Sequence, residues 1–415
     1  MTDDPTAIPV APPTHRVEGH DGPLRGVTVL DLATVGPAAR CTRILADYGA
    51  TVVKVGAVPG RGAEAIQPPF YAYSGSRYLQ RTAIDLKDPE GRDAFLALAG
   101  RADVVVESFR PGVVDRLGIG FDALVAVNPG IILCSTTGYG QDGPRSGWAG
   151  HDLNYLAVGG YLATTEPRAD GGPPVPGATI ADAAGGGMQA AMAVMAALIG
   201  RAGGGGGAHL DVSIADGVLW LTSLAVDEHL ATGQAVGHGD NIITGRYACY
   251  DTYRAGDGGW LAVGAIEPKF YANLCRLLGC EQWLTHQLDD EVQDKIRADF
   301  RAAFAGRGRD AWVAELAGAD TCVTPVLSVA ELTEDAQYAA RHAFVDAVST
   351  LTAAEGGAGT PTRFRQVAPV LAGMEAPDGP VVIGDPLRSD TDRLLTDAGL
   401  TPGQVADLKE RGVVA

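Results

Sequence analysis

The stretch GVTVLDLATVGPAARCTRILADYGATVVKV, residues 26–55, decides the fold class. It begins with an apolar, β-branched run at 26–32 and ends with a second such run at 50–55. The residues between the two runs, from about Pro37 to Tyr48, follow a helical pattern. Two strands separated by one helix predict a right-handed βαβ unit, in which the two strands are parallel.

The same alternation continues along the chain. Further apolar runs stand at 83–86, 102–109 and 130–137, and helical patterns at 88–100 and 118–129 separate them. Strands that alternate with helices at this spacing predict a mostly parallel sheet with helices on both faces. The fold class is therefore α/β, with a doubly wound large domain.

Glycine-rich segments divide the second part of this domain. A loop of Gly, Pro and Ser at 138–150 precedes a helix that we expect to start near Asp152. Residues 183–200 are apolar on all sides, which predicts a buried central helix. The glycine run at 203–207 predicts a turn before a further strand and helix.

The remaining chain reads as a smaller α/β domain and a tail. Residues 231–243 are polar and glycine-rich, and a hairpin-like pair and two amphipathic helices follow. The expected organisation is a flexible N-terminal extension at 1–23, a large Rossmann-like domain at 24–230, a small domain with linkers at 231–340, and a segment at 341–415 that returns to the large domain.

Composition excludes several classes of protein. The net charge of −18 and the pI near 4.8 argue against a nucleic-acid partner and against a membrane partner. The six cysteines lack CxxC spacing and the histidines lack metal-ligand spacing, so we expect a cytoplasmic protein without a metal site. No GxGxxG follows the first strand, which disfavours a nicotinamide cofactor.

Five segments resemble the class III (CaiB/BaiF-type) CoA-transferases and their alpha-methylacyl-CoA racemase branch. They occur in the family's order and stand at 24–55, 83–120, 138–155, 209–217 and 322–331. GHDLNY at 150–155 and GAIEPKFY at 264–271 are similar to the racemases in particular. The resemblance implies an acyl-CoA substrate, no cofactor besides the CoA of that substrate, and a homodimer whose two chains interlock.

A polyanion such as CoA requires a local exception in an acidic chain. Residues 36–120 hold eleven Lys and Arg against nine Asp and Glu, a balance of +2. The candidates for phosphate contacts are Lys54, Arg77, Arg81 and Arg110, because guanidinium groups suit phosphate oxygens. Arg110 is favoured, since it follows a strand at the sheet edge where α/β proteins bind ligands. Each of them could equally be a solvated surface charge.

Racemisation of a 2-methylacyl thioester requires two bases on opposite faces of a planar enolate. His151 and Asp182 are the candidates, and each is predicted at the start of a helix. The positive end of a helix dipole favours a neutral imidazole, which can accept a proton. The resemblance pairs Glu267 with the imidazole, whose tautomer it would set, and Asp152 with Asp182.

The glycines after Asp182 complete the predicted site. Gly185, Gly186 and Gly187 carry no side chains, so a thioester could approach the N–H groups of a helix N-terminus.

Plainer interpretations stay open beside these. Asp182 could be a helix N-cap, His151 a loop residue and Glu267 an acid in the first turn of a helix. The favoured function is interconversion of (2R)- and (2S)-2-methylacyl-CoA thioesters through an enolate. The alternatives are a CoA-transferase that forms an aspartyl-CoA intermediate on Asp182 and a noncatalytic acyl-CoA-binding subunit.

Overall fold

The computed structural model describes residues 22–33, 36–60, 77–349, 363–369, 371–374, 377, 379–383 and 389–415. The predicted N-terminal extension lies almost entirely outside these residues. The chain divides into two compact units. The first comprises Met1–Tyr155, Ala178–Val218 and Ala336–Ala415, and the second comprises Leu156–Gly177 and Leu219–Asp335.

The first unit is built on a six-stranded sheet in the order β3-β2-β1-β4-β5-β6, and every neighbouring pair in it is parallel. The predicted doubly wound α/β fold is confirmed. The strands are β1 Thr28–Asp31, β2 Thr51–Gly56, β3 Leu79–Ala83, β4 Val104–Glu107, β5 Ile132–Thr137 and β6 Ala208–Ser213. The third strand starts four residues before the predicted run, and Ile84 of that run instead forms an isolated bridge with Val414.

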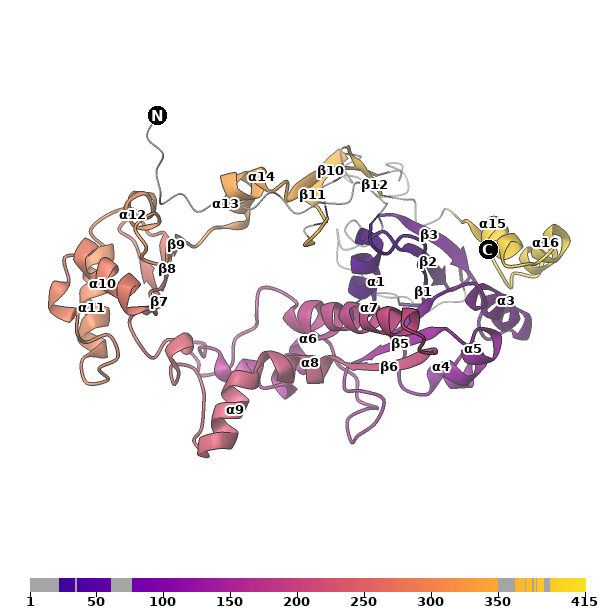
Figure 1. The fold of residues 1–415 in the computed structure, drawn as a ribbon, viewed down its shortest axis with the longest axis horizontal. Coiled ribbons are helices and arrows are strands. Elements are labelled where there is room, and N and C mark those ends of the chain that lie inside the picture. Colours follow the sequence, from indigo (N-terminus) through magenta and orange to yellow (C-terminus); the bar gives the residue numbers. More distant parts are fainter. Residues whose placement is uncertain are drawn as a thin grey trace. The chain divides into compact units, whose positions relative to one another are not determined.

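Helices cover both faces of this sheet (Figure 1). Successive strand residues point to opposite faces, so Val29 packs beneath α1 and α7 while Leu30 packs toward α3 and α5. Apolar residues of α15 and α16 belong to the same core as Leu30. The helices are α1 Pro37–Asp47, α3 Pro89–Ala99, α4 Val113–Arg116, α5 Phe121–Val127, α6 Asp152–Val158, η2 Ala181–Met188, α7 Gln189–Ala202, α8 Ile214–Leu221, α15 Thr391–Asp397 and α16 Pro402–Glu410.

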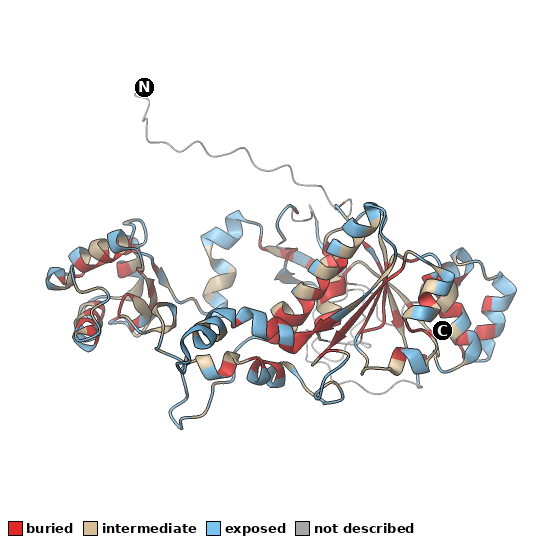
Figure 2. Ribbon diagram, turned by 60° about the horizontal axis from the view of Figure 1, so that its bottom comes forward, coloured by how far each residue is buried: buried red, intermediate tan, exposed pale blue. Residues whose placement is uncertain are grey.

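The predicted central helix is buried on one side only, which corrects the expectation. Its two parts, η2 and α7, form a continuous 22-residue helix that is long and apolar enough to cross a membrane by length and composition. Ala190, Ala191 and Val194 pack on the sheet, whereas Met188, Met192 and Ile199 are exposed. Figure 2 shows the same contrast for helices of the first unit, which are red toward the sheet and tan or pale blue away from it. A helix that covers one face of a sheet also has an outer side that faces away from the sheet. The outer side of this helix is apolar.

A second small sheet, in the order β11-β10-β12, also belongs to the first unit. Its strands are β10 Phe344–Ser349, β11 Arg363–Val367 and β12 Val381–Ile383.

The second unit has its own core of helices packed on a three-stranded antiparallel sheet, β7-β8-β9. The predicted hairpin is confirmed, because Tyr250–Arg254 pairs antiparallel with Trp260–Gly264. The elements are η1 Tyr161–Thr164, α9 Ser223–Thr232, η3 Ile242–Thr244, β7 Tyr250–Arg254, β8 Trp260–Gly264, α10 Pro268–Leu277, η4 Glu281–Trp283, α11 Gln293–Phe304, α12 Arg309–Leu316, β9 Val323–Pro325 and α13 Val329–Glu334. The first unit resumes with α14 Ala336–Ala340.

The unit boundaries differ from the predicted ones. The second unit begins again at Leu219, twelve residues before the expected linker at 231, and it also includes Leu156–Gly177. A polar, glycine-rich segment marks a surface loop, and such loops occur within a unit as well as between units. The C-terminal segment from Ala336 onward belongs to the first unit.

Candidate active site

The strand order reverses between β1 and β4, and ligands of α/β proteins bind beyond the carboxyl ends of the strands at such a point. Two buried carboxyl groups end these strands. Asp31 accepts hydrogen bonds from the N–H of Ala33 and the hydroxyl of Thr42. Glu107, whose pKa is raised by burial, accepts from the N–H of Phe109 at 2.6 Å. Both carboxyl groups therefore hold the loops that leave the sheet.

Two of the four predicted phosphate ligands, Lys54 and Arg77, already form ion pairs with carboxylates of the first unit, so the prediction is corrected for these two. The ammonium group of Lys54 lies 3.1 Å from Asp31 and is largely buried, so its charge is neutralised within the sheet. Arg77 is almost fully buried and forms a two-pronged ion pair with Asp47, at 2.9 and 3.0 Å, and a 2.8 Å bond to the carbonyl of Val367. A guanidinium enclosed in this way ties segments of the first unit together and is not accessible to a phosphate.

The other two arginines stay candidates. Arg81 is half-buried on β3, and its backbone N–H and C=O both bond to Asp390. Arg110 is exposed just beyond β4 and makes no ion pair with any residue that the structure describes. Gly112 then turns the chain into α4 with a φ of 76°. Arg110 thus lies at the edge of the sheet where the fold places ligands.

His151 occupies the position before the first residue of α6, as predicted. Its carbonyl accepts hydrogen bonds from the N–H groups of Asn154, at 2.8 Å, and Tyr155. The side-chain oxygen of Asn154 accepts in return from the N–H of His151 at 3.0 Å. Reciprocal bonds of this kind define a helix start, and they leave the exposed imidazole outside the helix.

Asp182 lies in the first turn of η2, and Ile180 occupies the N-cap position, so the capping interpretation of Asp182 is wrong. The carboxylate of Asp152 accepts the N–H of Asp182 at 2.8 Å. The structure thus connects the start of α6 to the start of η2. Asp152 thus holds the backbone of Asp182 through this bond, and its charge raises the pKa of the Asp182 carboxyl group.

The pKa of the Asp182 carboxyl group is raised to about 6. Burial is the largest cause, and the nearby charge of Asp152 adds to it, while Arg40 and His151 oppose it. A Cβ placed on Gly36, the N-cap of α1, would lie 3.9 Å from the Asp182 carboxylate, which locates this group near the start of α1. η2 is a π-type helix, a form that is frequent at functional sites.

Arg40 is a site residue that the sequence reasoning missed. It lies on α1, donates a hydrogen bond to Thr179, and lowers the pKa of Asp182 through its charge. Its position in the sequence could have identified it, because it lies in the first helix after β1. In such folds the turn between the first strand and this helix contacts ligands.

The glycines after Asp182 do not form the expected donor site. Gly185, Gly186 and Gly187 are buried inside η2 rather than at an open helix end. A Cβ on Gly186 would lie 2.5 Å from Pro37, and one on Gly185 would lie 3.1 Å from the carbonyl of Ile214. These glycines let η2 approach α1 and α8 closely, so their absent side chains serve helix packing.

Glu267 belongs to the second unit. It is exposed at the N-cap of α10, directly before Pro268, and its side chain accepts no capping hydrogen bond. Its pairing with the imidazole of His151 stays a prediction.

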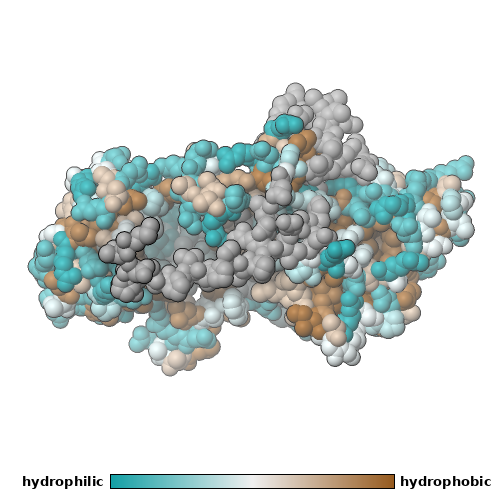
Figure 3. Space-filling view, turned by 45° about the horizontal axis from the view of Figure 1, so that its top comes forward, coloured by the Kyte–Doolittle hydropathy of each residue, from teal (hydrophilic) through white to brown (hydrophobic). Residues whose placement is uncertain are grey.

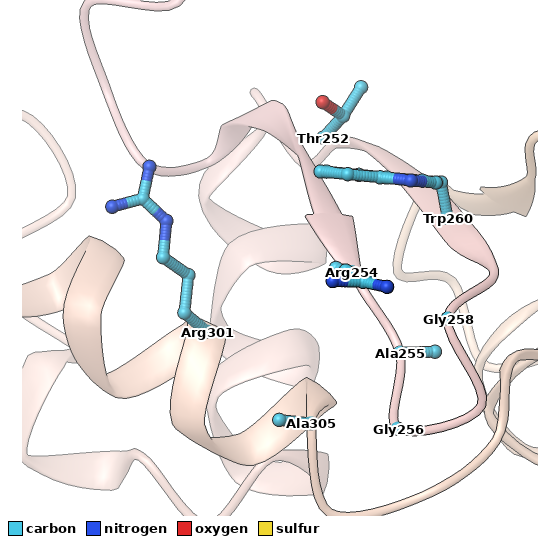
Figure 4. Close-up of a pocket in the computed structure, with 8 residues that line it drawn as sticks. All are labelled: Thr252, Arg254, Ala255, Gly256, Gly258, Trp260, Arg301 and Ala305. Carbon is cyan, nitrogen blue, oxygen red and sulfur yellow. The ribbon is translucent and has the colours of Figure 1, made fainter.

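A hollow of about 590 Å³ in the second unit is lined by Arg254, Trp260 and Arg301 among others. Figure 4 shows Arg301 rising from α11, and Arg254 and Trp260 coming from the facing hairpin. Arg301 lies in the last turn of α11, where a cation balances the helix dipole, and Arg254 is directly opposite Trp260 across the two strands. The helix dipole and the cross-strand pair thus give these residues structural roles, and none of the predicted site residues lines this hollow.

Comparisons with known proteins agree with this fold. The sequence pattern of CoA-transferase family III matches residues 24–375. An alpha-methylacyl-CoA racemase from Mus musculus is 36% identical over 328 residues, which cover 78% of this chain and 82% of that protein. A succinyl-CoA:glutarate CoA-transferase from Mus musculus is 32% identical and covers 76% and 74% of the two chains.

A solved structure of a CaiB/BaiF family protein from Brucella suis superposes with a TM-score of 0.66. It is 26% identical and covers 89% of this chain and 93% of that one. The fold and these relatives thus define an enzyme of the CoA-transferase and racemase kind. The chain belongs to CoA-transferase family III.

Proposed function

We propose that this enzyme interconverts the two epimers of 2-methylacyl-CoA thioesters by moving the α-proton through an enolate. The observation that carries the proposal is the link between the two candidate bases. Asp152, the first residue of α6, holds the backbone of Asp182, and His151 directly precedes that helix. The charge of His151 also lowers the pKa of Asp182, which supports the proximity of the two candidate bases.

A two-base reaction requires that one base is protonated while the other is not. For one epimer, neutral His151 removes the α-proton, the C–H electron pair becomes the C=C bond of the enolate, and protonated Asp182 returns a proton to the opposite face. For the other epimer, ionised Asp182 removes the proton and protonated His151 returns one. The pair carries one proton in either direction. A pKa of about 6 for Asp182 supports this, because it lies in the range in which imidazoles titrate.

Binding of the CoA part is assigned to the edge of the sheet. Arg110 is exposed beyond β4 and is not engaged by a carboxylate of the described chain, which leaves its guanidinium for a phosphate. Arg81 is the second candidate.

We also propose a cytoplasmic location. The six cysteines are unpaired, which supports a reducing compartment.

A CoA-transferase is the second candidate function, and the transferase among the relatives favours it. In that reaction the Asp182 carboxylate attacks the thioester carbonyl and expels the CoA thiolate, which then attacks the resulting anhydride and releases the acid. Asp182 is left carrying CoA as a thioester. This route requires Asp182 but no base on the opposite face.

Deuterium exchange separates the two functions. The enzyme is incubated with each epimer of a 2-methylacyl-CoA in heavy water without an acceptor acid, and α-deuterium is measured by mass spectrometry. We expect incorporation, and we expect His151→Ala to slow racemisation by about 10²–10⁴-fold while Asp182 still exchanges the proton of one epimer. A hydroxylamine-trapped adduct on Asp182, without deuterium at the α-carbon in the wild type, would establish the transferase instead.

We also propose that the protein is a homodimer. The apolar outer side of the continuous helix η2–α7 supports this, with Met188 of η2 and Met192 and Ile199 of α7 exposed. In the second unit, Trp220 and Leu230 of α8 and α9 are exposed as well. Further apolar side chains reach the surface as separate patches (Figure 3). Exposed apolar patches are typical of protein interfaces.

A further inference from the structure

The peptide group between Gly150 and His151 is held by two side chains. Its carbonyl oxygen, on Gly150, accepts a hydrogen bond from the hydroxyl of Tyr155 at 2.6 Å. Its N–H, on His151, donates to the side-chain oxygen of Asn154 at 3.0 Å. With both polar groups of one peptide engaged, that peptide plane cannot rotate without breaking a hydrogen bond.

The ring of Tyr155 also supports the loop that leads to His151. A Cβ on Gly138, at the start of this loop, would lie 2.5 Å from the ring, and one on Gly150, at its end, would lie 2.7 Å from it. Tyr139, inside the loop, meets the same ring edge-on with centroids 5.3 Å apart. The two ends of the loop therefore rest on one buried aromatic side chain.

The plane of this peptide sets the direction of the His151 side chain. The carbonyl of His151 is bonded into the first turn of α6, so its own backbone is fixed on the C-terminal side. Once the preceding peptide is fixed as well, little freedom is left except the rotation of the side chain itself. A base must lie within hydrogen-bond reach of the proton that it removes, and a displacement of about 1 Å can cost about 100-fold in rate.

We propose that Tyr155 and Asn154 are positioning residues that orient His151 for proton transfer by clamping the Gly150–His151 peptide. The assignment rests on the proposed racemase function. Asp182 is held by a different contact, the carboxylate of Asp152, so the clamp acts on one of the two bases only.

The hydroxyl of Tyr155 is suited to this role. Burial and the nearby carboxylates of Asp182 and Asp152 raise its pKa to about 12. It stays protonated over the working range of the enzyme and can donate to the carbonyl throughout.

The test compares Tyr155→Phe with Tyr253→Phe. Tyr253 makes the same kind of bond, from its hydroxyl to the carbonyl of Ala248 at 2.7 Å, inside the second unit. Both variants keep the ring and lose one donor. We expect Tyr155→Phe to slow exchange of the epimer that His151 deprotonates about tenfold with little change in KM, and to leave the epimer that Asp182 deprotonates within twofold of wild type. Tyr253→Phe should leave both rates unchanged.

Equal slowing of both epimers by Tyr155→Phe, or slowing of neither, would overturn the inference. Asn154→Ala offers a second route to the same peptide. Because both side chains hold one group, the double variant should lose less than the product of the two single effects.

A spectroscopic readout keeps the inference separate from the proposed function. In protein labelled with ¹³C at histidine Cε1, the His151 resonance is assigned from its loss in His151→Gln. We expect it to shift or broaden in Tyr155→Phe and not in Tyr253→Phe, whether or not the wild type exchanges the α-proton. An unchanged His151 resonance would overturn the clamp, whereas a changed resonance with no exchange in the wild type would overturn only the racemase.

Discussion

Ionisation of the Asp182 carboxyl group costs more free energy in the folded protein than in water, because the group is partly buried. Its pKa of about 6 lies above the ordinary value of 3.8, so the folded protein binds this proton more tightly than the unfolded chain does. The free energy of unfolding therefore falls as pH rises from about 4 to about 6, and the loss is complete above that range. A site that carries such a carboxyl group exchanges stability for function.

Asp182→Asn should consequently stabilise the protein at high pH. A shift of about two pH units corresponds to roughly 2.7 kcal/mol, and solvent screening of this partly exposed carboxyl reduces the expected gain to about 1–2 kcal/mol above pH 6. Below about pH 4 the gain should vanish, because the wild-type carboxyl group is then protonated. Urea melts from pH 4 to pH 8 measure it. A gain independent of pH would show that ionisation is not the cause.

Arg77 and Arg110 should behave in opposite ways when truncated. Arg77→Ala removes the two-pronged partner of buried Asp47 and leaves it only the longer ion pair with Arg43 at 3.6 Å, which costs about 1–3 kcal/mol of folding free energy. Arg110→Ala should leave stability unchanged, weaken acyl-CoA binding about tenfold and make it less sensitive to salt. Calorimetry at two salt concentrations and urea melts on both variants check this. Unchanged affinity in Arg110→Ala would move the phosphate site elsewhere.

At the scale of elements, the contact of η2 with α1 depends on glycine. In Gly186→Ala the new methyl group would lie 2.5 Å from Pro37 and 3.0 Å from Ile214. Overpacking of this kind costs about 1–3 kcal/mol. Gly200→Ala is the matched control, since it lies in the same continuous helix and a Cβ there meets no atom within 4 Å. That change should stabilise by about 0.5–1 kcal/mol. Equal effects of the two substitutions in urea melts would contradict the packing argument.

At the scale of the whole molecule, the apolar outer side of α7 predicts self-association. Sedimentation velocity should show a dimer at nanomolar concentration, and Ile199→Asp should weaken it by placing a charge on that side. Val127→Asp is the control, because Val127 is also an exposed apolar residue, at 44% against 74% for Ile199, but ends α5 on the opposite face of the sheet. A stable, active monomer at nanomolar concentration would contradict the prediction.

The sequence by itself determined the parallel sheet and the helix start at His151. The strands at 26–32 and 50–55 are apolar runs whose pattern is local, and the reciprocal bonds of His151 and Asn154 span only three residues. The hairpin of β7 and β8 was predictable for the same reason. Local patterns suffice where the deciding contacts lie close together in the chain.

Only the tertiary structure decided which charged side chains are available to bind a ligand, and that the glycines of η2 allow close helix packing. Arg77 is enclosed by Asp47, thirty residues away, and by Val367, 290 residues away. Gly186 packs against Pro37 from a distant part of the chain. Asp152 reaches Asp182 across thirty residues, and the pKa of Asp182 follows from that contact and from burial. Desolvation and ion pairing depend on neighbours in space, and no spacing along the chain specifies them.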